Sequence, residues 1–136
     1  MKIKLIKNAK MPSKGRDGDA AFDLYLLEDI IINPESSFCL DTGICLELPH
    51  GYAGIIVPRS STAKKGISIS NCLIDENYRG EIHILGFNSS KNTYNYNKDD
   101  RLASLLIFPI FTDKLEEVEE LSETNRGSSW DGSSGK

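Results

Sequence analysis

The sequence has few of the features that mark disulfide-linked or zinc-binding proteins. Its three cysteines, Cys39, Cys45 and Cys72, are odd in number and form no CxxC pair, which argues against a disulfide framework or a zinc site. We expect all three to be buried, reduced thiols. The two histidines, His50 and His83, are far apart and lack metal-ligand spacing, so we expect structural or surface roles for both.

Long apolar runs and an excess of positive charge are also missing. The N-terminal stretch MKIKLIKNAK interleaves charged and apolar residues, so it has no apolar run long enough for a signal peptide or a membrane span. The formal net charge is −4, which gives no global basic field to recruit nucleic acid. We therefore expect a soluble, cytoplasmic protein that binds neither nucleic acid nor a membrane. Local cationic groups can still hold an anionic ligand.

What the sequence does contain is a series of short apolar runs. Its 136 residues, 39% of them hydrophobic, suffice for one domain with a core. The runs IKLI, FDLYLL, IIIN, ICLELP, YAGIIVP, EIHILGF and LASLLIFPIF lack helical spacing and predict strands. Turn signals separate them: NPESS, DTG, PHG, NSSKN and NKDD. Many short strands at this spacing predict an all-β sandwich or barrel.

One short helix is predicted in PRSSTAKKG, directly after the run GIIVP. Ser60 or Ser61 can cap its N-terminus, and Gly66 can end it in the left-handed conformation. A helix start presents unpaired N–H groups and the positive end of the helix dipole. Together with Arg59 and the two hydroxyls, this turn can therefore bind a phosphate. The alternative is a capped turn without a ligand, because turns of this composition are common.

The segment NCLIDENYRGEIHI predicts a hairpin with reactive groups near its turn. Asp75 follows the apolar pair Leu73–Ile74, Tyr78 comes three residues later, and a new strand begins at Glu81. The backbone of such a hairpin can read the edge of a base, the ring can pack against a sugar, and the carboxylate can hold and polarise a water. The alternative is a structural hairpin in which Asp75 caps a turn and Tyr78 fills the edge of the core.

The last segment, TNRGSSWDGSSGK, contains the only tryptophan and consists mostly of Gly, Ser and Asp. Apolar residues become scarce near Glu123, which predicts a boundary between a β domain of residues 1–123 and a flexible arm of residues 124–136. Gly and Ser bury too little apolar surface to offset the entropy of ordering, so we expect the arm to order only with a ligand. The acidic stretch DKLEEVEELSET before it is expected to be a strand or an extended, solvated segment.

Taken together, these segments resemble the trimeric dUTPase family over nearly the whole chain. DAAFDLY resembles its first motif, PRSS its second, LIDENYRGEI its third, DDRLASL its fourth and RGSSWDGSSG its fifth, in the family's order. The resemblance implies a homotrimer of distorted jelly-roll barrels of the β-clip type, with sites between subunits. It also implies Mg²⁺-dependent hydrolysis of dUTP to dUMP and pyrophosphate, which limits uracil incorporation into DNA and supplies dUMP. The arm would close over the nucleotide of a neighbouring subunit.

The same resemblance implies roles for individual residues. Asp75 would activate the water that attacks the α-phosphorus, and Mg²⁺ would be bound through the phosphates, with no direct protein ligand. Asp23, Asp100 and Arg101 would support the site. Arg59 and Arg101 have two alternatives, phosphate contact or pairing with carboxylates such as Asp23 and Asp100, and we favour pairing for Arg101. The expected substrate-binding residues are Arg59, Ser60, Ser61, Cys72, Ile74, Tyr78, Ser104, Arg126, Trp130, Gly132, Ser133 and Ser134.

Several positions depart from the family pattern, among them a mild change at Ser61, a different residue type at Ile69, and three changes at Cys72, Ser104 and Asp131. Cys72 stands where the family has Gly, a replacement that is strained if the position needs a positive φ. Ser104 stands where the family has Gln, which helps to hold the water network. Asp131 stands where the family has the Phe that stacks on uracil. We expect Trp130, one residue earlier, to supply the aromatic face.

The sequence is also compatible with two alternative functions. A dCTP deaminase shares the fold, but the DENYRG segment and the Gly/Ser-rich arm favour a dUTPase. The second alternative is a nucleotide-binding or regulatory protein with weak turnover, which the departures at Cys72, Ser104 and Asp131 support. A regulatory protein partner is not identified by the sequence.

Overall fold

The structure is a computed structural model that describes residues 1–128. The predicted contacts of Trp130, Gly132, Ser133 and Ser134 lie outside the described residues. Within them the chain is nearly all β, with one short helix, which confirms the predicted fold class. Over the same range, no helix has both the length and the apolar character needed to cross a membrane.

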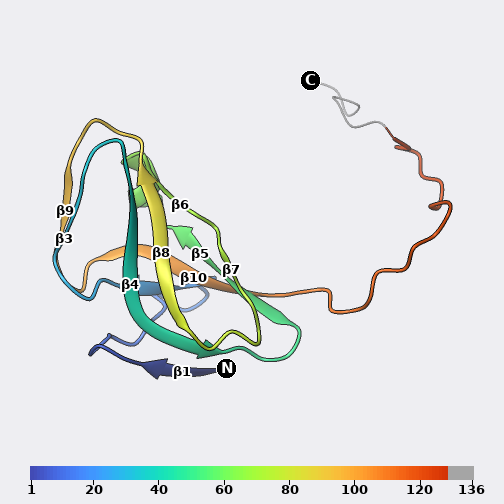
Figure 1. The fold of residues 1–136 in the computed structure, drawn as a ribbon, viewed down its shortest axis with the longest axis horizontal. Helices are drawn as coiled ribbons and strands as arrows, with labels where there is room; N and C mark the ends of the chain where they lie inside the picture. Colours follow the sequence, from blue (N-terminus) through green and yellow to red (C-terminus); the bar gives the residue numbers. More distant parts are fainter. Residues whose placement is uncertain (129–136) are drawn as a thin grey trace.

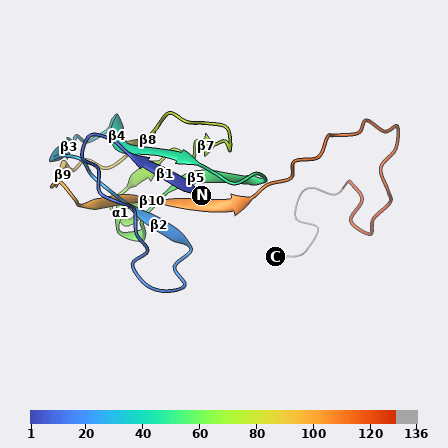
Figure 2. The same ribbon diagram turned by 90° about the horizontal axis from the view of Figure 1, so that it is seen from below.

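Two four-stranded antiparallel sheets form the body of the molecule, stacked face to face (Figure 1, Figure 2). The first has the order β1-β4-β8-β6, built from Lys2–Leu5, Ser36–Glu47, Glu81–Asn88 and Ile67–Ile69. The second has the order β2-β10-β5-β7, built from Ala21–Tyr25, Arg101–Pro109, Tyr52–Pro58 and Leu73–Ile74. A ribbon of β3 (Ile30–Ile32) and β9 (Tyr94–Tyr96) lies at the end away from the C-terminal segment (Figure 1).

The core lies between the two sheets, because alternate residues of their strands point inward. In β8, for example, Ile82 and Ile84 are buried. β10 pairs with β2 on one side and β5 on the other, and residues 102–105 are buried consecutively. β10 is therefore buried on both faces over this stretch.

Replacing Leu102 by Ala is expected to lower the free energy of unfolding by about 2–5 kcal/mol, because truncating a buried side chain leaves a cavity. Leu102 is 0% exposed, whereas Ile31 on β3 is 68% exposed. Ile31→Ala is therefore the matched control, with an expected change below about 0.5 kcal/mol. Chemical denaturation at one fixed protein concentration measures both variants. Equal losses at the two positions would contradict the described packing.

The predicted helix is present as α1 (Ser60–Lys64), but its N-cap differs from the prediction. Arg59 occupies the N-cap position, with an extended backbone and no side-chain capping bond. Neither Ser60 nor Ser61 is therefore the cap, because both already lie inside the helix. Gly66 follows the helix with a φ of 81°, which confirms the predicted left-handed end.

The turn predicted at residues 41–43 is wrong, because β4 runs through these residues without a break. Its pairing with β8 shifts between Asp41 and Cys45, which marks a β-bulge. Gly43 has a φ of 68°, and a Cβ atom at this residue would lie 2.6 Å from the Ile6 carbonyl oxygen. Gly43 is needed for the bulge and for the close approach of two chain segments. In the sequence, a glycine with this role cannot be told from a glycine in a turn.

The segment predicted as one hairpin is divided between the two sheets. β7 pairs with β5, whereas β8 pairs with β4 and β6. Residues 70–80 therefore cross from the first sheet to the second and back, and we call them the crossover loop. This path places Asp75 at the end of a strand of the second sheet.

The expectation of buried cysteines is also wrong. Cys39 and Cys72 are exposed and Cys45 is partly exposed, and all three are free thiols. Cys39 and Cys45 lie on β4 at positions that alternate with its buried or partly buried residues, so they point away from the core. Cys72 lies in the crossover loop just before β7.

Residues 110–128 contain no helix or strand and run away from the sheets (Figure 1). The acidic stretch within them is therefore extended and solvated, the second of the two predicted alternatives. Leu115 and Leu121 are 93% and 87% exposed. The sheets end with β10 at Pro109, so the residues between Pro109 and the predicted boundary near Glu123 add nothing to them.

Candidate functional site

Asp23 is the centre of a group of polar side chains from β2, β10 and the start of α1. Its Oδ1 lies 3.1 Å from Arg59 Nε, and its Oδ2 lies 3.0 Å from Arg101 Nη1. Ser104 Oγ donates to Oδ1 at 3.0 Å. The Asp23 side chain is only 13% exposed, so two guanidinium groups compensate a charge that is largely removed from water. We call these four residues the Asp23 cluster.

The Asp23 cluster bears on the alternatives for the two arginines. Arg101 pairs with Asp23, whereas Asp100 accepts a hydrogen bond from the Asn97 N–H at 2.8 Å. Arg59 pairs with Asp23 as well, and its Nη1 donates to the Arg101 carbonyl at 3.3 Å. Both guanidinium groups thus make a structural contact, and phosphate binding by Arg59 stays a prediction.

The start of α1 exposes the two predicted phosphate-binding hydroxyls. Ser60 and Ser61 are exposed, while Thr62 is buried. Thr62 Oγ1 donates to the Leu102 carbonyl at 2.7 Å, which fixes the helix on β10. The two serines therefore lie on a helical turn that Thr62 attaches to β10. No sequence motif marked Thr62 for this role.

Asp75 is exposed at the point where the crossover loop leaves β7. Within residues 1–128 its carboxylate has no hydrogen-bond or ion-pair partner. The turn that follows is closed by the backbone, since the Tyr78 N–H donates to the Asp75 carbonyl at 3.1 Å. The Asp75 side chain does not cap this turn, and its acceptor oxygens face water.

Tyr78 stands next to this turn and is 44% exposed, so it does not fill the edge of the core. Its hydroxyl donates to the Glu81 carbonyl at 3.0 Å. The ring lies against Gly80, where a Cβ atom would come within 2.3 Å of the Tyr78 hydroxyl. Because Gly80 has no side chain, the Tyr78 ring can lie against it, and nearly half of the Tyr78 surface is exposed.

A cavity of about 180 Å³ opens between the crossover loop and β8. Residues that line it include Cys72, Ile74, Asp75, Tyr78, Ile82 and Leu85. The first four of these are predicted site residues, and their cavity is apolar with a carboxylate at its edge, as is common for ligand sites. Cys72 is not among the residues with a positive φ, so it carries no strain of that kind.

The crossover loop and the start of α1 lie beside different parts of β5 (Figure 2). β7 pairs with the first half of β5 through Ile74 and Gly54, whereas α1 follows its end at Pro58. The strand between Gly54 and Pro58 spans about 13 Å at about 3.3 Å per residue. Within one copy of the chain, Asp75 and Ser60 are therefore not adjacent.

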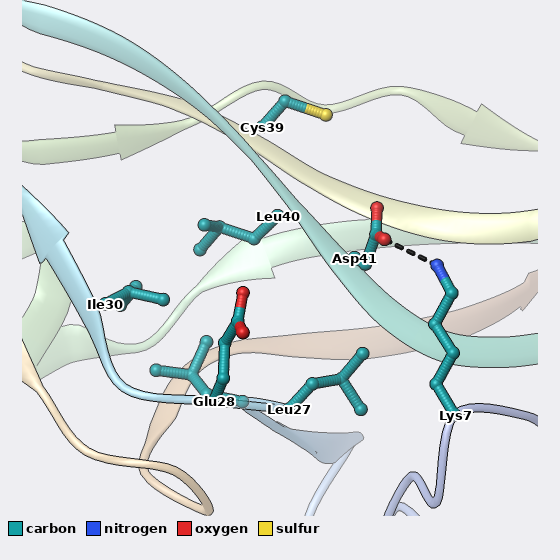
Figure 3. A pocket seen from close by; sticks show the side chains of 8 residues that line it. Lys7, Leu27, Glu28, Ile30, Cys39, Leu40 and Asp41 are labelled. Carbon is teal, nitrogen blue, oxygen red and sulfur yellow. Dashed lines mark hydrogen bonds and ion pairs between the residues drawn. The ribbon is translucent and has the colours of Figure 1, made fainter.

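A larger cavity, of about 460 Å³, lies elsewhere and contains none of the predicted site residues (Figure 3). It is lined by Lys7, Leu26, Leu27, Glu28, Ile30, Cys39, Leu40 and Asp41. At its edge the Lys7 ammonium pairs with Asp41 and Glu81. Lys7 donates hydrogen bonds to Asp41 and Glu81, and these bonds, the Asp41 bond first, raise the pKa of Lys7 to about 12. Lys7 in turn lowers the pKa of both carboxyl groups.

Asp41, Glu81 and His83 bring potential metal-ligand atoms within 4.8 Å of one another. His83 Nδ1 lies 3.1 Å from Asp41 Oδ1. Lys7 pairs with both carboxylates, so the described residues form an ion-pair network here. His83 has the structural and surface role expected from the sequence.

The sequence of this chain matches a known protein family over most of its length. The model of the dUTPase family matches residues 7–135. The chain belongs to the dUTPase family. Its similarity to the deoxyuridine 5'-triphosphate nucleotidohydrolase of Clostridium tetani is 42% identity over 140 residues, covering 100% of this chain and 97% of that protein. The protein of the same name from vaccinia virus is 40% identical over 133 residues, covering 98% of this chain and 90% of that protein.

Solved dUTPase structures show the same fold. A mutant dUTPase of Staphylococcus bacteriophage 80alpha, solved with dUpNHpp, has a TM-score of 0.91 at 29% identity and covers 99% of this chain and 98% of that chain. A mutant dUTPase from phage phi11 of S. aureus, described with a structural Mg(II) ion, has a TM-score of 0.80 at 27% identity. It covers 88% of this chain and 96% of that chain. The dUTPase fold is therefore shown over nearly the full length.

Proposed function

We propose that this dUTPase-family protein hydrolyses dUTP to dUMP and pyrophosphate. The observation that carries the proposal is the Asp75 carboxylate, which is exposed, lacks a protein partner within residues 1–128 and stands at the edge of a cavity beside Tyr78. A carboxylate in this state can accept a proton from a water and orient it. The relatives named above carry the activity in their names.

The proposed reaction needs no covalent intermediate. A water held by Asp75 attacks the α-phosphorus, the bond from that phosphorus to the bridging oxygen breaks, and pyrophosphate leaves with its electron pair. The water proton passes to the Asp75 carboxylate. The remaining contributions are positioning of the polyphosphate in line with the water and stabilisation of charge on the leaving group.

Selectivity for deoxyuridine follows from the cavity walls. The ring of Tyr78, fixed against Gly80, packs on the sugar and leaves no room for a ribose 2′-hydroxyl. Cys72 and Ile74 line the space for the base, whose edge the loop backbone reads. A wall that clashes with the methyl group of thymine rejects it more strongly than a missing contact would.

Sites between the subunits of a homotrimer explain why Asp75 and the serines of α1 are apart within one chain. Asp75 and the start of α1 lie at different levels of β5 in one chain, so Ser60 and Ser61 reach the phosphates of a nucleotide bound by a neighbouring copy. In this arrangement Arg59 stands next to those phosphates while Asp23 holds it. Arg101 and Ser104 also bond to Asp23 and so help to hold the carboxylate that positions Arg59.

The arm of residues 124–136 is proposed to close over the nucleotide. Arg126 would contact the terminal phosphate, since a guanidinium binds phosphate oxygens in a bidentate manner. Ser133 and Ser134 would donate to phosphate oxygens, and Gly132 would let the backbone approach. Trp130 would stack on uracil. Closure excludes water other than the attacking one.

Mg²⁺ is the proposed cofactor, bound through the phosphates. Near Asp75 the other carboxylates of the described residues are already paired: Glu76 with His50, and Glu81 with Lys7. A site without a carboxylate cage fits a Mg²⁺ ion that takes its ligands from the triphosphate and water. When bound, the ion neutralises charge on the phosphates.

The test is release of pyrophosphate from dUTP with Mg²⁺, beside dCTP, dTTP and UTP. We expect turnover of dUTP with a kcat/KM at least about a hundredfold above that of the other three, because a clash or a lost pairing costs several kcal/mol. Ammonia release from dCTP would show a deaminase instead. Tight binding of dUTP with negligible turnover would show a binding or regulatory protein.

A further inference from the structure

Glu76 directly follows Asp75, and its carboxylate is bonded to the turn between β4 and β5. Its Oε2 accepts a hydrogen bond from the Gly51 N–H at 2.7 Å, and its Oε1 lies 3.0 Å from His50 Nδ1. The Glu76 side chain is 33% exposed, whereas that of His50 is 82% exposed. An exposed ion pair contributes little, while a charge-assisted bond to a part-buried N–H is stronger. The Gly51 contact is thus the main attachment.

Asp75 is consequently held from both sides by one short segment. Before it, Ile74 is buried and pairs with Gly54 of β5. After it, Glu76 is bonded to Gly51, which immediately precedes β5. A residue whose two neighbours are both attached to residues 51–54 has little freedom to rotate its backbone.

The same turn contacts the root of the C-terminal segment. The Ile110 N–H donates to the Gly51 carbonyl at 2.9 Å. On the far side of the loop, Arg79 Nη1 donates to the carbonyls of Glu76 and Tyr78 at 2.6 Å and 2.9 Å. The Gly51 residue therefore bonds the crossover loop through its N–H and the start of the C-terminal segment through its carbonyl.

We propose that Glu76 is a positioning residue for the hydrolysis of dUTP. Its carboxylate, bonded to the Gly51 N–H, sets the direction in which the Asp75 carboxylate meets the attacking water. This inference rests on the proposed function. Glu76 itself touches neither the nucleotide nor the water. A displacement of a reacting group by about 1 Å can cost about a hundredfold in rate. Loss of the Glu76 contact is therefore expected to lower kcat.

The experiment compares three variants of the full chain in steady-state dUTP hydrolysis. Glu76→Ala removes the acceptor, and kcat is expected to fall about ten- to hundredfold with KM changed less than about threefold. Glu76→Gln keeps an oxygen for the Gly51 N–H and is expected to stay within about threefold of wild type. Glu47→Ala is the matched control, because it removes an exposed carboxylate that pairs with Lys2 and should leave kcat unchanged.

Two further measurements separate the outcomes. A calorimetric titration with a non-hydrolysable dUTP analogue and a thermal melt are recorded for Glu76→Ala. Reduced kcat with retained affinity and rescue by Gln supports the inference. Wild-type kcat in Glu76→Ala overturns it, and so does joint loss of affinity and thermal stability without rescue, which would show a merely structural residue. Absence of dUTP turnover in the wild-type chain overturns the proposed function and this inference with it.

Discussion

Asp75→Asn is expected to lower kcat for dUTP by about 10²–10⁴-fold, the range in which removal of a general base acts. The amide cannot take the proton of the attacking water, although it has nearly the shape of the carboxylate. The fold of the loop should survive, because the turn is closed by the backbone bond from Tyr78 to the Asp75 carbonyl. Initial rates of pyrophosphate release measure the effect.

Binding data and a matched charge change complete this test. Affinity for a non-hydrolysable dUTP analogue is expected to be retained in Asp75→Asn, because the substitution removes a negative charge near a polyanion. Asp113→Asn makes the same chemical change in the exposed segment after β10 and should leave turnover unaltered. Turnover of Asp75→Asn within tenfold of wild type would remove Asp75 from the proposed role of base.

Truncation before Arg126 is expected to lower kcat/KM for dUTP by about 10²–10³-fold or more. The deletion removes a guanidinium, several hydroxyls and the closure that excludes water, and one well-placed donor alone contributes in this range. The rate of pyrophosphate release and the affinity for the analogue are measured side by side. The control is a chain that lacks only Lys136, which lies beyond the fifth motif RGSSWDGSSG.

Single substitutions in the arm show which group is responsible. Arg126→Ala tests the phosphate contact, and Trp130→Ala tests stacking on uracil. Should Trp130→Ala leave both turnover and analogue affinity unchanged, the stacking proposal is wrong. Selective dUTP turnover that survives the truncation would keep the enzyme and discard the role of the arm.

The sequence predicted β5, β8 and β10 well, because their side chains carry the pattern of burial. The run YAGIIVP corresponds to β5, and EIHILGF to most of β8. β6, β9 and the first half of β4 were not predicted, because three-residue strands and the polar sequence around Ser36 give no periodic signal. The pairing of β7 with β5 depends on the second sheet, and no local pattern encodes it.

The candidate site was recognised through its motifs, but its internal contacts were not. Spacing places Asp75 and Tyr78 on one loop, and the structure adds that the carboxylate is exposed beside the ring. The link from Ser104 to Asp23 joins residues from distant motifs, and only the pairing of β10 with β2 brings them together. The bond from Gly51 to Glu76 has no sequence signal, because it joins a turn and a loop 25 residues apart.

The Asp23 cluster also constrains the order in which its members can be replaced. One carboxylate pairs with two guanidinium groups, so loss of Arg59 or Arg101 first leaves an ordinary one-to-one ion pair. Loss of Asp23 first leaves two guanidinium groups, with side chains 30% and 41% exposed, close together without their shared counter-charge, which is the more costly state. Substitutions in this cluster are therefore not additive. Lineages that change it are expected to pass through an arginine replacement before they lose the aspartate.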